Sequence, residues 1–381
     1  MHAPTPPPIL ALNAGSSSLK YALLSGGARL AAGTVPRIGE PGAPVADHAG
    51  AVARVLDELA RHRPPPAAVG HRVVHGGARF HRPTLIDDAV LAAIEELSAL
   101  APLHNPPGLA VIRAARRALP GVPQVAVFDT AFHAGMPAEA SGYALDRETA
   151  ARYGIRRYGF HGISVRYVAA ATATLLGRPL PDLNMVVLHL GNGASATAVA
   201  GGRGVDTSMG MTPLEGLVMG TRTGDIDPAV VFHLARAGLP LDRIEELYQH
   251  GSGLLGLCGE NDMRDVLTRA GRGDEAAEHA VASYCYRIRK YVGAYQAVLG
   301  RLDAVVFTAG VGEHSPTVRS RSLAGLAALG IAVDPSRNAS GDPARVISPD
   351  TGRVAVCVVP TDEERGIAEE TAATIPRPGR G

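Results

Sequence analysis

The sequence predicts an α/β protein of two domains in which one structural unit occurs twice. Short apolar runs of strand length alternate with longer stretches of helical periodicity, an alternation typical of α/β folds. A hairpin of two short strands around a small polar turn occurs at residues 9–24 and again at residues 184–204. The chain has 381 residues, more than one hydrophobic core usually organises, so we expect two domains.

The elements of the first half follow in regular order. Residues 9–13 (ILALN) and 21–24 (YALL) are expected to be strands that flank the polar turn AGSSSLK. Helical patterns then occur near residues 47–62, 87–100 and 106–118, and strand patterns occur near residues 67–74 and 124–128. We place the domain change near residue 150, which gives an N-terminal domain of residues 1–150 and a C-terminal domain of residues 151–364.

The second half begins with a helix and then repeats the hairpin. The helix is expected from Gly162 to Gly177, opened by Ser164. The strand NMVVLHL then leads through the turn GNG into the strand ASATAVA and the turn GGRG.

The chain ends in two strand-to-helix units. The segment AVVFTAGVGEHSP is expected to form a strand, a glycine turn and a helix capped by Ser315. After the strand RVAVCVV, Thr361 is expected to cap a last helix, with Glu364 completing a capping box. Residues 365–381 of this helix are expected to join the first domain.

Composition indicates which kinds of binding partner and which cellular compartment to expect for this protein. The 37 basic and 36 acidic residues nearly cancel, so the chain lacks the positive excess that nucleic-acid binding needs. The start MHAPTPPP lacks the features of a signal peptide, and no apolar run is long enough to cross a membrane, so we expect neither export nor a membrane segment. Cys258, Cys285 and Cys357 are odd in number and contain no CxxC pair, which favours the reducing cytoplasm.

Glycine-containing turns are candidates for phosphate binding. Both hairpin turns are built from small residues that leave backbone N–H groups and hydroxyls open to phosphate oxygens. A third turn, Gly310-Val311-Gly312, follows an apolar strand and would let a nucleotide lie against the backbone. Each turn alone could be an ordinary tight turn, because glycine and serine are common there. Their recurrence in matching contexts favours a nucleotide site.

Two arginines are candidates for neutralising a transferring phosphoryl group, which spreads negative charge over its oxygens. Arg72 lies in GHRVVHGG and Arg222 in MGTRTGD, both among small residues. Arg72 falls inside a strand pattern, so a structural ion pair is the alternative interpretation.

Histidines and carboxylates provide further candidates. His104, His161 and His189 lie at the edges of apolar segments, where each could reach a ligand or serve only the structure. Asp129 ends the strand QVAVF, at the edge of the sheet where ligands usually bind, although it could instead bond the next turn. Glu363 could hold Mg²⁺ or simply favour a helix N-terminus.

Nine motifs together resemble the acetate kinases, over nearly the whole chain. They are NAGSSSLKY, GHRVVHGG, APLHNPP, FDTAFH, YGFHG, HLGNGAS, DTSMGMTPLEGLVMGTR, FTAGVGE and PTDEE. The resemblance implies the two-domain actin-like ATPase (ribonuclease H-like) fold with a duplicated βββαβαβα core. It also implies a cytoplasmic homodimer that reversibly transfers the γ-phosphoryl group of ATP to acetate, giving acetyl phosphate and ADP by direct in-line transfer.

The same resemblance assigns roles to residues. Arg72 and Arg222 would bind the acetate carboxylate and the phosphoryl group, and His161 would stabilise the transition state. Asp129 would orient the reacting groups or the waters of the metal, while Asn13 and Glu363 would position Mg²⁺, with Mn²⁺ as an alternative ion. ATP binding falls to Ser16, Ser18, Lys20, His189, Gly191, Asn192, Gly193, Asp262, Met263, Arg264, Gly310, Val311, Gly312 and His314. His314 departs from the family, which commonly has asparagine there.

The resemblance also predicts an apolar pocket for the acetate methyl group, lined by Val74, Leu103, Phe160 and Pro213. Propionate kinases of the family tend to carry a smaller residue at the position of Val74, so valine favours acetate. One methylene is worth roughly 1–3 kcal/mol, so a propionate or butyrate kinase is the nearest alternative. A chaperone or filament-forming ATPase of the same superfamily is a second alternative, but about twenty residues after Val359 leave no room for a peptide-binding region.

Overall fold

The computed structural model describes residues 6–375 and divides into two compact units. Unit 1 comprises residues 1–134, 162–164 and 362–381, and unit 2 comprises residues 135–161 and 165–361. Residues 1–5 and 376–381, which include the end of the predicted C-terminal helix, lie outside the described range.

The predicted boundary near residue 150 falls inside a helix of unit 2, α5 (Arg147–Tyr153). The chain after α5 is bonded within that unit, because the backbone N–H groups of Tyr158 and Gly159 donate to the carbonyl of Gly210 at 3.0 and 3.2 Å. Unit 2 therefore begins before α5.

Unit 1 is built on a six-stranded mixed sheet in the order β3-β2-β1-β4-β6-β5. The strands are β1 (Ile9–Ala14), β2 (Leu19–Ser25), β3 (Ala28–Val35), β4 (Ala68–Val73), β5 (Thr84–Leu85) and β6 (Gln124–Phe128). The first three form an antiparallel meander, and β4 and β6 extend the sheet in parallel with β1. The carboxyl ends of β1, β4 and β6 consequently meet at one edge.

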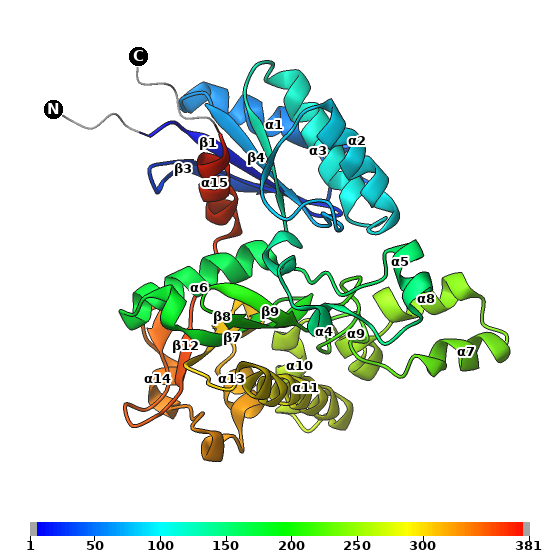
Figure 1. Cartoon of the computed structure of the whole chain (residues 1–381), viewed down its shortest axis with the longest axis vertical. Helices are drawn as coiled ribbons and strands as arrows, with labels where there is room; N and C mark the ends of the chain where they lie inside the picture. Colours follow the sequence, from blue (N-terminus) through cyan, green and yellow to red (C-terminus); the bar gives the residue numbers. More distant parts are fainter. Residues whose placement is uncertain (1–5, 376–381) are drawn as a thin grey trace. The chain divides into compact units, whose positions relative to one another are not determined.

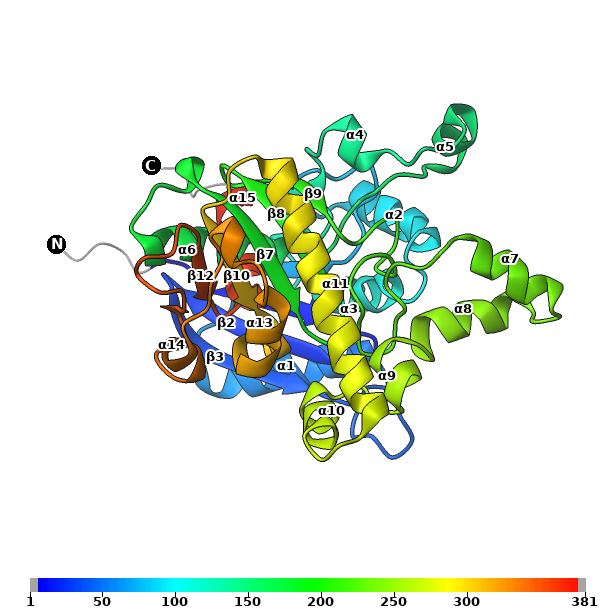
Figure 2. The same ribbon diagram turned by 90° about the horizontal axis from the view of Figure 1, so that it is seen from below.

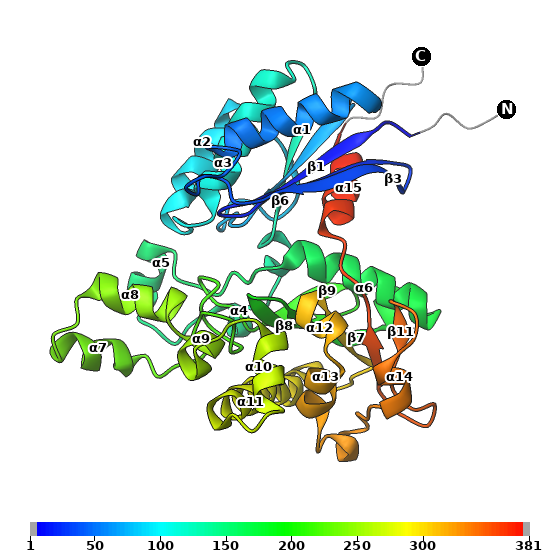
Figure 3. The same cartoon turned by 180° about the vertical axis from the view of Figure 1, so that it is seen from behind.

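Helices cover both faces of this sheet (Figures 1 and 3). They are α1 (His48–His62), α2 (Asp88–Glu96), η1 (Leu97–Ala99), α3 (Asn105–Ala118), η2 (Ala131–His133) and α15 (Glu363–Thr374). Side chains alternate along β1, so Leu10 and Leu12 pack in the core under α1 and α3, while Ile9 and Ala11 pack with Ile367 of α15. The strands are apolar on both faces for that reason.

Unit 2 repeats the arrangement with a six-stranded sheet in the order β11-β12-β10-β7-β8-β9. Its strands are β7 (Asn184–Leu190), β8 (Ala194–Ala200), β9 (Arg203–Thr207), β10 (Ala304–Thr308), β11 (Arg345–Val346) and β12 (Ala355–Val358). Again three antiparallel strands are followed by two parallel ones, and a short antiparallel strand closes the edge. The predicted duplication and α/β class are confirmed.

The helices of unit 2 form layers on its sheet, with α6 on one face and α11 on the other (Figures 1 and 2). The smaller elements are α4 (Ala138–Ser141), α5, η3 (Leu180–Asp182), α7 (Ala229–Arg236), α8 (Leu241–His250), α9 (Gly253–Cys258), α10 (Met263–Ala270), α12 (Ala309–His314), α13 (Pro316–Leu323), η4 (Ala327–Leu329) and α14 (Pro335–Ala339). The two covering helices are α6 (Gly162–Leu176) and α11 (Glu275–Leu299).

Two predicted helix starts are wrong. The N-cap of α6 is His161 rather than Ser164, and His161 holds a left-handed backbone with φ of 58°. The N-cap of α15 is Asp362 rather than Thr361, because the Asp362 carboxylate accepts from the N–H of Arg365. Aspartate is at least as good a cap as threonine, and it was one residue away.

The structure also describes the three cysteines and the lengths and polarity of the helices. Cys258, Cys285 and Cys357 are free and buried. In residues 6–375, helices are too short or too polar for a membrane crossing.

Candidate active site

In unit 1 the edge formed by β4 and β6 carries a buried ion pair. Nε and Nη2 of Arg72 donate to Oδ2 of Asp129 at 3.0 and 2.7 Å. The two side chains are only 19% and 3% exposed. Burial opposes the charge of Arg72, but the carboxylates of Asp129 and Glu363 outweigh it and raise the pKa of the guanidinium. Arg72 is thus a permanent cation at the carboxyl edge of the sheet.

Asn13, at the end of β1, links this pair to the start of α15. Its Oδ1 accepts from Nη1 of Arg72 at 3.1 Å. Its Nδ2 donates to Oε2 of Glu363 at 2.8 Å and to Oε1 of Glu364 at 3.0 Å. The structure therefore brings Asn13, Arg72, Asp129 and Glu363 together, as well as Glu364.

The charge balance of this cluster fits a divalent cation. The carboxylates of Asp129, Glu363 and Glu364 each interact electrostatically with the guanidinium of Arg72. The cluster therefore contains three carboxylates around one guanidinium. Mg²⁺ prefers such oxygen ligands and retains several waters. No group of three or more His, Cys, Asp or Glu side chains within residues 6–375 is arranged to hold a metal directly. The residues fit an ion bound largely through water and phosphate.

The turn between β1 and β2 carries the serines and the lysine predicted for phosphate binding. The N–H of Gly15 donates to the carbonyl of Ser18 at 2.8 Å, which closes the turn. Ser16 and Lys20 are exposed and Ser18 is half-buried. Lys20 is paired with Asn13 across the hairpin, so both side chains extend from the same face of the sheet.

In unit 2 the predicted histidines lie against one another. The rings of His161 and His189 are stacked, with centroids 4.1 Å apart. Nδ1 of His161 lies 3.0 Å from Oγ of Ser195. His189 is the penultimate residue of β7, and Ser195 lies opposite it on β8. The His161 ring therefore contacts two residues that the pairing of β7 with β8 places side by side. Nε2 of His161 lies on the edge of the ring that borders Gly193.

Arg222 lies beside the same turn. A Cβ atom built on Gly193 would be 3.4 Å from Nη1 of Arg222 and 3.7 Å from Nε2 of His161, so both groups border this glycine. Arg222 donates to the carbonyl of Pro213 at 3.2 Å, and no carboxylate in the described chain forms an ion pair with it. Burial lowers the pKa of Arg222. A partly buried cation without a carboxylate partner is suited to a ligand anion.

The loop of Arg222 is fitted tightly to the glycine turn. The N–H of Gly220 donates to the carbonyl of Asn192 at 2.8 Å. A Cβ atom on Gly220 would be 1.9 Å from Oδ1 of Asn192, so any larger residue would push the two apart. Glycine at this position lets the arginine loop approach the turn.

A cavity of about 560 Å³ adjoins this turn. Of the predicted ATP-binding residues, its walls include Gly191, Asn192, Asp262, Met263, Arg264, Gly310, Val311 and His314. The turn at residues 310–312 is itself part of a short helix, α12, so its glycines allow a close helical approach instead of forming an open turn. The volume suits a nucleotide-sized ligand.

The four residues predicted for the methyl pocket are divided between the units. Val74 is buried in unit 1, while Leu103 of the same unit is 48% exposed. Phe160 is buried in unit 2 and Pro213 is half-buried there. Leu103 lies in a turn before α3 and not in a core position.

Several residues at the cavity were missed by the sequence analysis. Leu254, Leu267 and Tyr284 line it with apolar surface, alongside Ser315 and Thr317. Leu267 follows Met263 by four residues on α10, a spacing that places both on one helix face and could have indicated its position. Leu254 and Tyr284 come from other helices, and only the tertiary fold brings them there.

The two six-stranded sheets of matching strand order, the Arg222 and His161 side chains beside Gly193 and the adjoining cavity define a protein of the two-domain actin-like ATPase fold. The chain belongs to the Acetokinase family, which it matches over residues 8–369.

Individual relatives agree with this family. The chain is 55% identical to the acetate kinase of Streptomyces avermitilis, over 97% of this chain and 98% of the relative. It is 56% identical to the acetate kinase of Clavibacter michiganensis subsp. michiganensis, over 96% and 99%. Among solved structures it resembles Porphyromonas gingivalis acetate kinase, with a TM-score of 0.90, 42% identity and coverage of 96% and 99%. It also resembles a propionate kinase from Francisella tularensis, with a TM-score of 0.91, 38% identity and coverage of 97% and 100%.

Proposed function

We propose that this protein catalyses reversible transfer of the γ-phosphoryl group of ATP to acetate, giving acetyl phosphate and ADP. The observation that carries the proposal is Arg222, a partly buried cation without a carboxylate partner, held with His161 at the Gly193 turn beside a nucleotide-sized cavity. Relatives more than 50% identical over nearly the full chain carry the name acetate kinase, which supports the same activity.

The chemistry requires positioning and charge neutralisation more than acid–base catalysis. Acetate is ionised at neutral pH, because carboxyl pKa values lie near 4, so its oxygen is already a nucleophile. It attacks the γ-phosphorus in line, the bond to the β-phosphate oxygen breaks, and ADP leaves with that electron pair. Arg222 and the Nε2 edge of His161 would neutralise charge on the transferring group.

Arg72 is proposed to bind the acetate carboxylate in unit 1. Its Nε and Nη2 are occupied by Asp129, and that bond fixes the plane of the guanidinium. A fixed guanidinium binds a second carboxylate with little loss of side-chain entropy. Asp129 therefore acts by orienting Arg72 and its surroundings.

The metal site of the proposal is the cluster of Asn13 and Glu363. These side chains would hold Mg²⁺, or Mn²⁺, directly or through its waters, and the bound ion would neutralise phosphate charge. Glu364 is included because it shares Asn13 with Glu363.

Acetate is the proposed substrate in preference to propionate. The isopropyl group of Val74, which is buried in unit 1, would limit the length of the acid. The similarity to a propionate kinase makes propionate the second candidate. One methylene changes binding by roughly 1–3 kcal/mol, so we expect propionate to be a slower substrate rather than an inert one.

A cytoplasmic homodimer completes the proposal. Exposed apolar side chains on α7 and α8 support self-association, since Phe232 and Leu241 are 58% and 69% exposed. Light scattering coupled to gel filtration should give twice the mass of the chain. A single-chain mass at micromolar concentration would refute the dimer.

The test of activity is hydroxamate trapping of the acyl phosphate, with ATP and Mg²⁺ and with acetate, propionate and butyrate in parallel. We expect the highest rate with acetate and loss of that rate in Arg222→Ala. A preference for propionate would transfer the assignment to that acid. ATP hydrolysis without acyl phosphate would refute the kinase assignment.

A further inference from the structure

Two irregular segments of unit 2 carry the proposed phosphoryl-binding groups. The first is the segment between α5 and α6, which ends in His161. The second is the long connection between β9 and α7, which contains Pro213 and Arg222. Neither segment has a helix or strand to hold its side chains in place, so other contacts must fix them.

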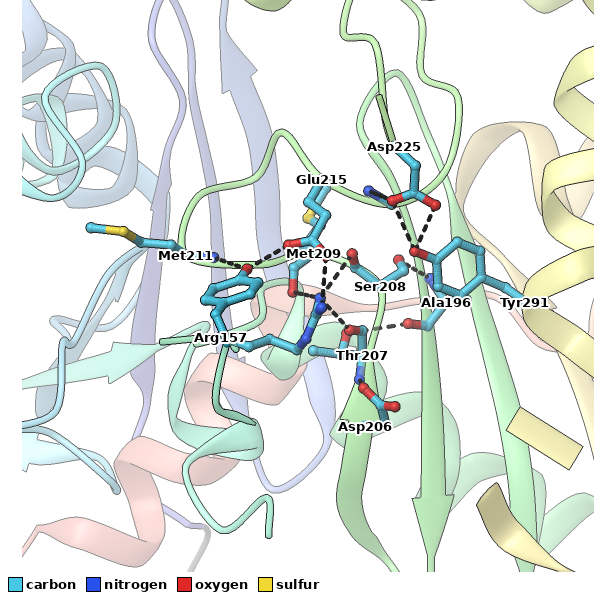
Figure 4. A network of polar contacts seen from close by, with 12 residues as sticks. Arg157, Ala196, Asp206, Thr207, Ser208, Met209, Met211, Glu215, Asp225 and Tyr291 are labelled. Carbon is cyan, nitrogen blue, oxygen red and sulfur yellow. Dashed lines mark hydrogen bonds and ion pairs between the residues drawn. The ribbon is translucent and has the colours of Figure 1, made fainter. Parts of the chain in front are cut away.

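A partly buried polar cluster joins these two segments (Figure 4). Nη1 of Arg157 donates to three successive carbonyls, those of Thr207, Ser208 and Met209, at 3.0, 3.3 and 3.2 Å. Nη2 of Arg157 donates to Oε1 of Glu215 at 2.6 Å. One guanidinium therefore fastens the His161 segment to both sides of the bend at residues 207–215.

Tyr143 closes the cluster on the other side of Glu215. Its hydroxyl donates to Oε2 of Glu215 and accepts from the N–H of Met211, the latter at 3.1 Å. Burial, followed by the Glu215 carboxylate, raises the pKa of Tyr143, so the phenol keeps its proton. We call Tyr143, Arg157 and Glu215 the clamp.

Two residues of the clamp, Tyr143 and Glu215, border Gly210, and Gly210 holds the His161 segment directly. A Cβ atom on Gly210 would be 2.0 Å from Oε2 of Glu215 and 2.1 Å from the hydroxyl of Tyr143. The carbonyl of Gly210 accepts from the N–H groups of Tyr158 and Gly159, three and two residues before His161. The clamp is thus connected through Gly210 to the backbone that leads to His161.

The same bend continues into the Arg222 loop. Gly216, next to Glu215, exchanges two hydrogen bonds with Asp225, through its N–H to Oδ1 and through its carbonyl to the Asp225 N–H, each 2.9 Å long. Tyr291 of α11 donates to Asp225, and Arg287 donates to the Gly216 carbonyl at 3.0 Å. The loop that carries Arg222 is closed at its base by this pair.

We propose that Tyr143, Arg157 and Glu215 are positioning residues that set the orientation of His161 relative to Pro213 and Arg222. None of the three is required to touch the substrate. The inference rests on the proposed function for its catalytic consequence, but the placement of His161 is measurable without any substrate.

The test uses three variants of the full chain and a matched control. Glu215→Gln keeps the shape of the side chain and removes its charge, Arg157→Lys keeps a charge without the fork of donors, and Tyr143→Phe removes one hydroxyl. The control is Glu278→Gln, which removes the carboxylate of another arginine pair of unit 2, with Arg321 on the surface.

The first readout is the NMR signal of the His161 imidazole, assigned by its absence in His161→Gln. In Glu215→Gln, Arg157→Lys and Tyr143→Phe we expect this signal to shift or broaden, with melting temperatures close to that of the unchanged protein. The control should leave the signal in place. An unchanged His161 signal in folded Glu215→Gln and Arg157→Lys would overturn the inference, whatever the enzyme does.

The second readout is kinetic. We expect kcat with acetate to fall about 10- to 100-fold in Glu215→Gln and Arg157→Lys, with the KM for ATP changed less than about 2-fold, because the cavity walls lie outside the clamp. In a His161→Ala background, adding Glu215→Gln should lower kcat little further, since both changes act through one residue. Fully multiplicative losses would contradict positioning through His161. If the unchanged protein forms no acyl phosphate, the proposed function fails, and the NMR readout still decides the clamp.

Discussion

Arg72 directs two nitrogens of its guanidinium, Nε and Nη2, to a single carboxylate oxygen of Asp129, at 3.0 and 2.7 Å. The third nitrogen, Nη1, donates to Oδ1 of Asn13 at 3.1 Å. Every nitrogen of the group thus has a partner in unit 1, yet the side chain remains 19% exposed. This arrangement fixes the plane of the cation while leaving an edge for an anion.

For activity, the planar set of donors on the Arg72 guanidinium should matter more than its positive charge. Arg72→Lys keeps a cation beside Asp129, so stability should be largely preserved, because the buried carboxylate is not left unpaired. A lysine cannot hold the carboxylate and the amide in one plane, so kcat/KM for acetate should fall about 10²- to 10³-fold. Steady-state kinetics with acetate as the varied substrate measures this. The control is Arg79→Lys, at an exposed ion pair with Glu96, which should leave kcat/KM unchanged. Equal activity of Arg72→Lys and the unchanged protein would exclude Arg72 from the site.

His161 should contribute to rate and little to nucleotide binding. Its Nδ1 is near Ser195, its ring stacks on His189, and its Nε2 edge borders Gly193 beside Arg222, where the phosphoryl group is proposed to bind. His161→Ala should therefore lower kcat about 10²- to 10³-fold with a small change in the KM for ATP. His81→Ala, at an exposed histidine, is the control. A rise in KM alone would assign His161 to ground-state binding instead.

Glu363 should govern the metal requirement. Glu363→Gln removes one of the carboxylates that Asn13 holds, so the Mg²⁺ concentration for half-maximal activity should rise about 10- to 100-fold. Magnesium titration at saturating ATP measures this shift. Glu95→Gln, at a surface pair with Arg113, should not move the titration. An unmoved titration in Glu363→Gln would place the metal elsewhere.

Val74 should select against longer acids. Val74→Ala removes two methyl groups from a buried position, which should cost about 1–3 kcal/mol of stability and make room in the pocket. The ratio of kcat/KM for propionate to that for acetate should rise about 10-fold or more. The same ratio in Val298→Ala, at an exposed valine of α11, should match the unchanged protein. No change of the ratio in Val74→Ala would show that Val74 does not contact the acid.

Buried His71 should make stability fall in acid. Burial lowers its pKa from 6.5 to about 4, partly opposed by the hydrogen bond to Gln124. The unfolded chain then binds a proton at higher pH than the folded one, so stability is complete above pH 6.5 and falls as pH drops toward 4, by about 3 kcal/mol. Chemical unfolding at pH 7.5, 6 and 5 measures the slope. His71→Gln should flatten the slope, whereas His279→Gln, at an exposed site, should not. A slope unchanged in His71→Gln would assign the acid sensitivity to other groups.

Much of the fold could be predicted because its signals are local. The apolar strands around Leu10 and Val187, the hairpin turns and the helical patterns all depend on residues close together in the chain. The exact start of a helix depends on competition between neighbouring caps, which is why Asp362 was missed in favour of Thr361.

The residues of the candidate site could be predicted from sequence motifs, but the side chains that hold them in place could not. Arg72 and Arg222 could be singled out because a charge among small residues needs an explanation. The clamp could not, because Tyr143, Arg157 and Glu215 are far apart in sequence and each resembles an ordinary surface residue there. The local signals are that Arg157 directly precedes the YGFHG motif and that Glu215 lies within DTSMGMTPLEGLVMGTR. Tyr284 likewise reaches the cavity from the middle of a long helix whose pattern indicates only burial.

The most direct test of the central claim is ³¹P NMR of the protein with ATP, Mg²⁺ and acetate. The account predicts that the γ-phosphorus signal of ATP is lost as an acetyl phosphate signal grows, only when acetate is present and not with Arg222→Ala. Inorganic phosphate appearing as the first product, or signals indifferent to acetate, would contradict it.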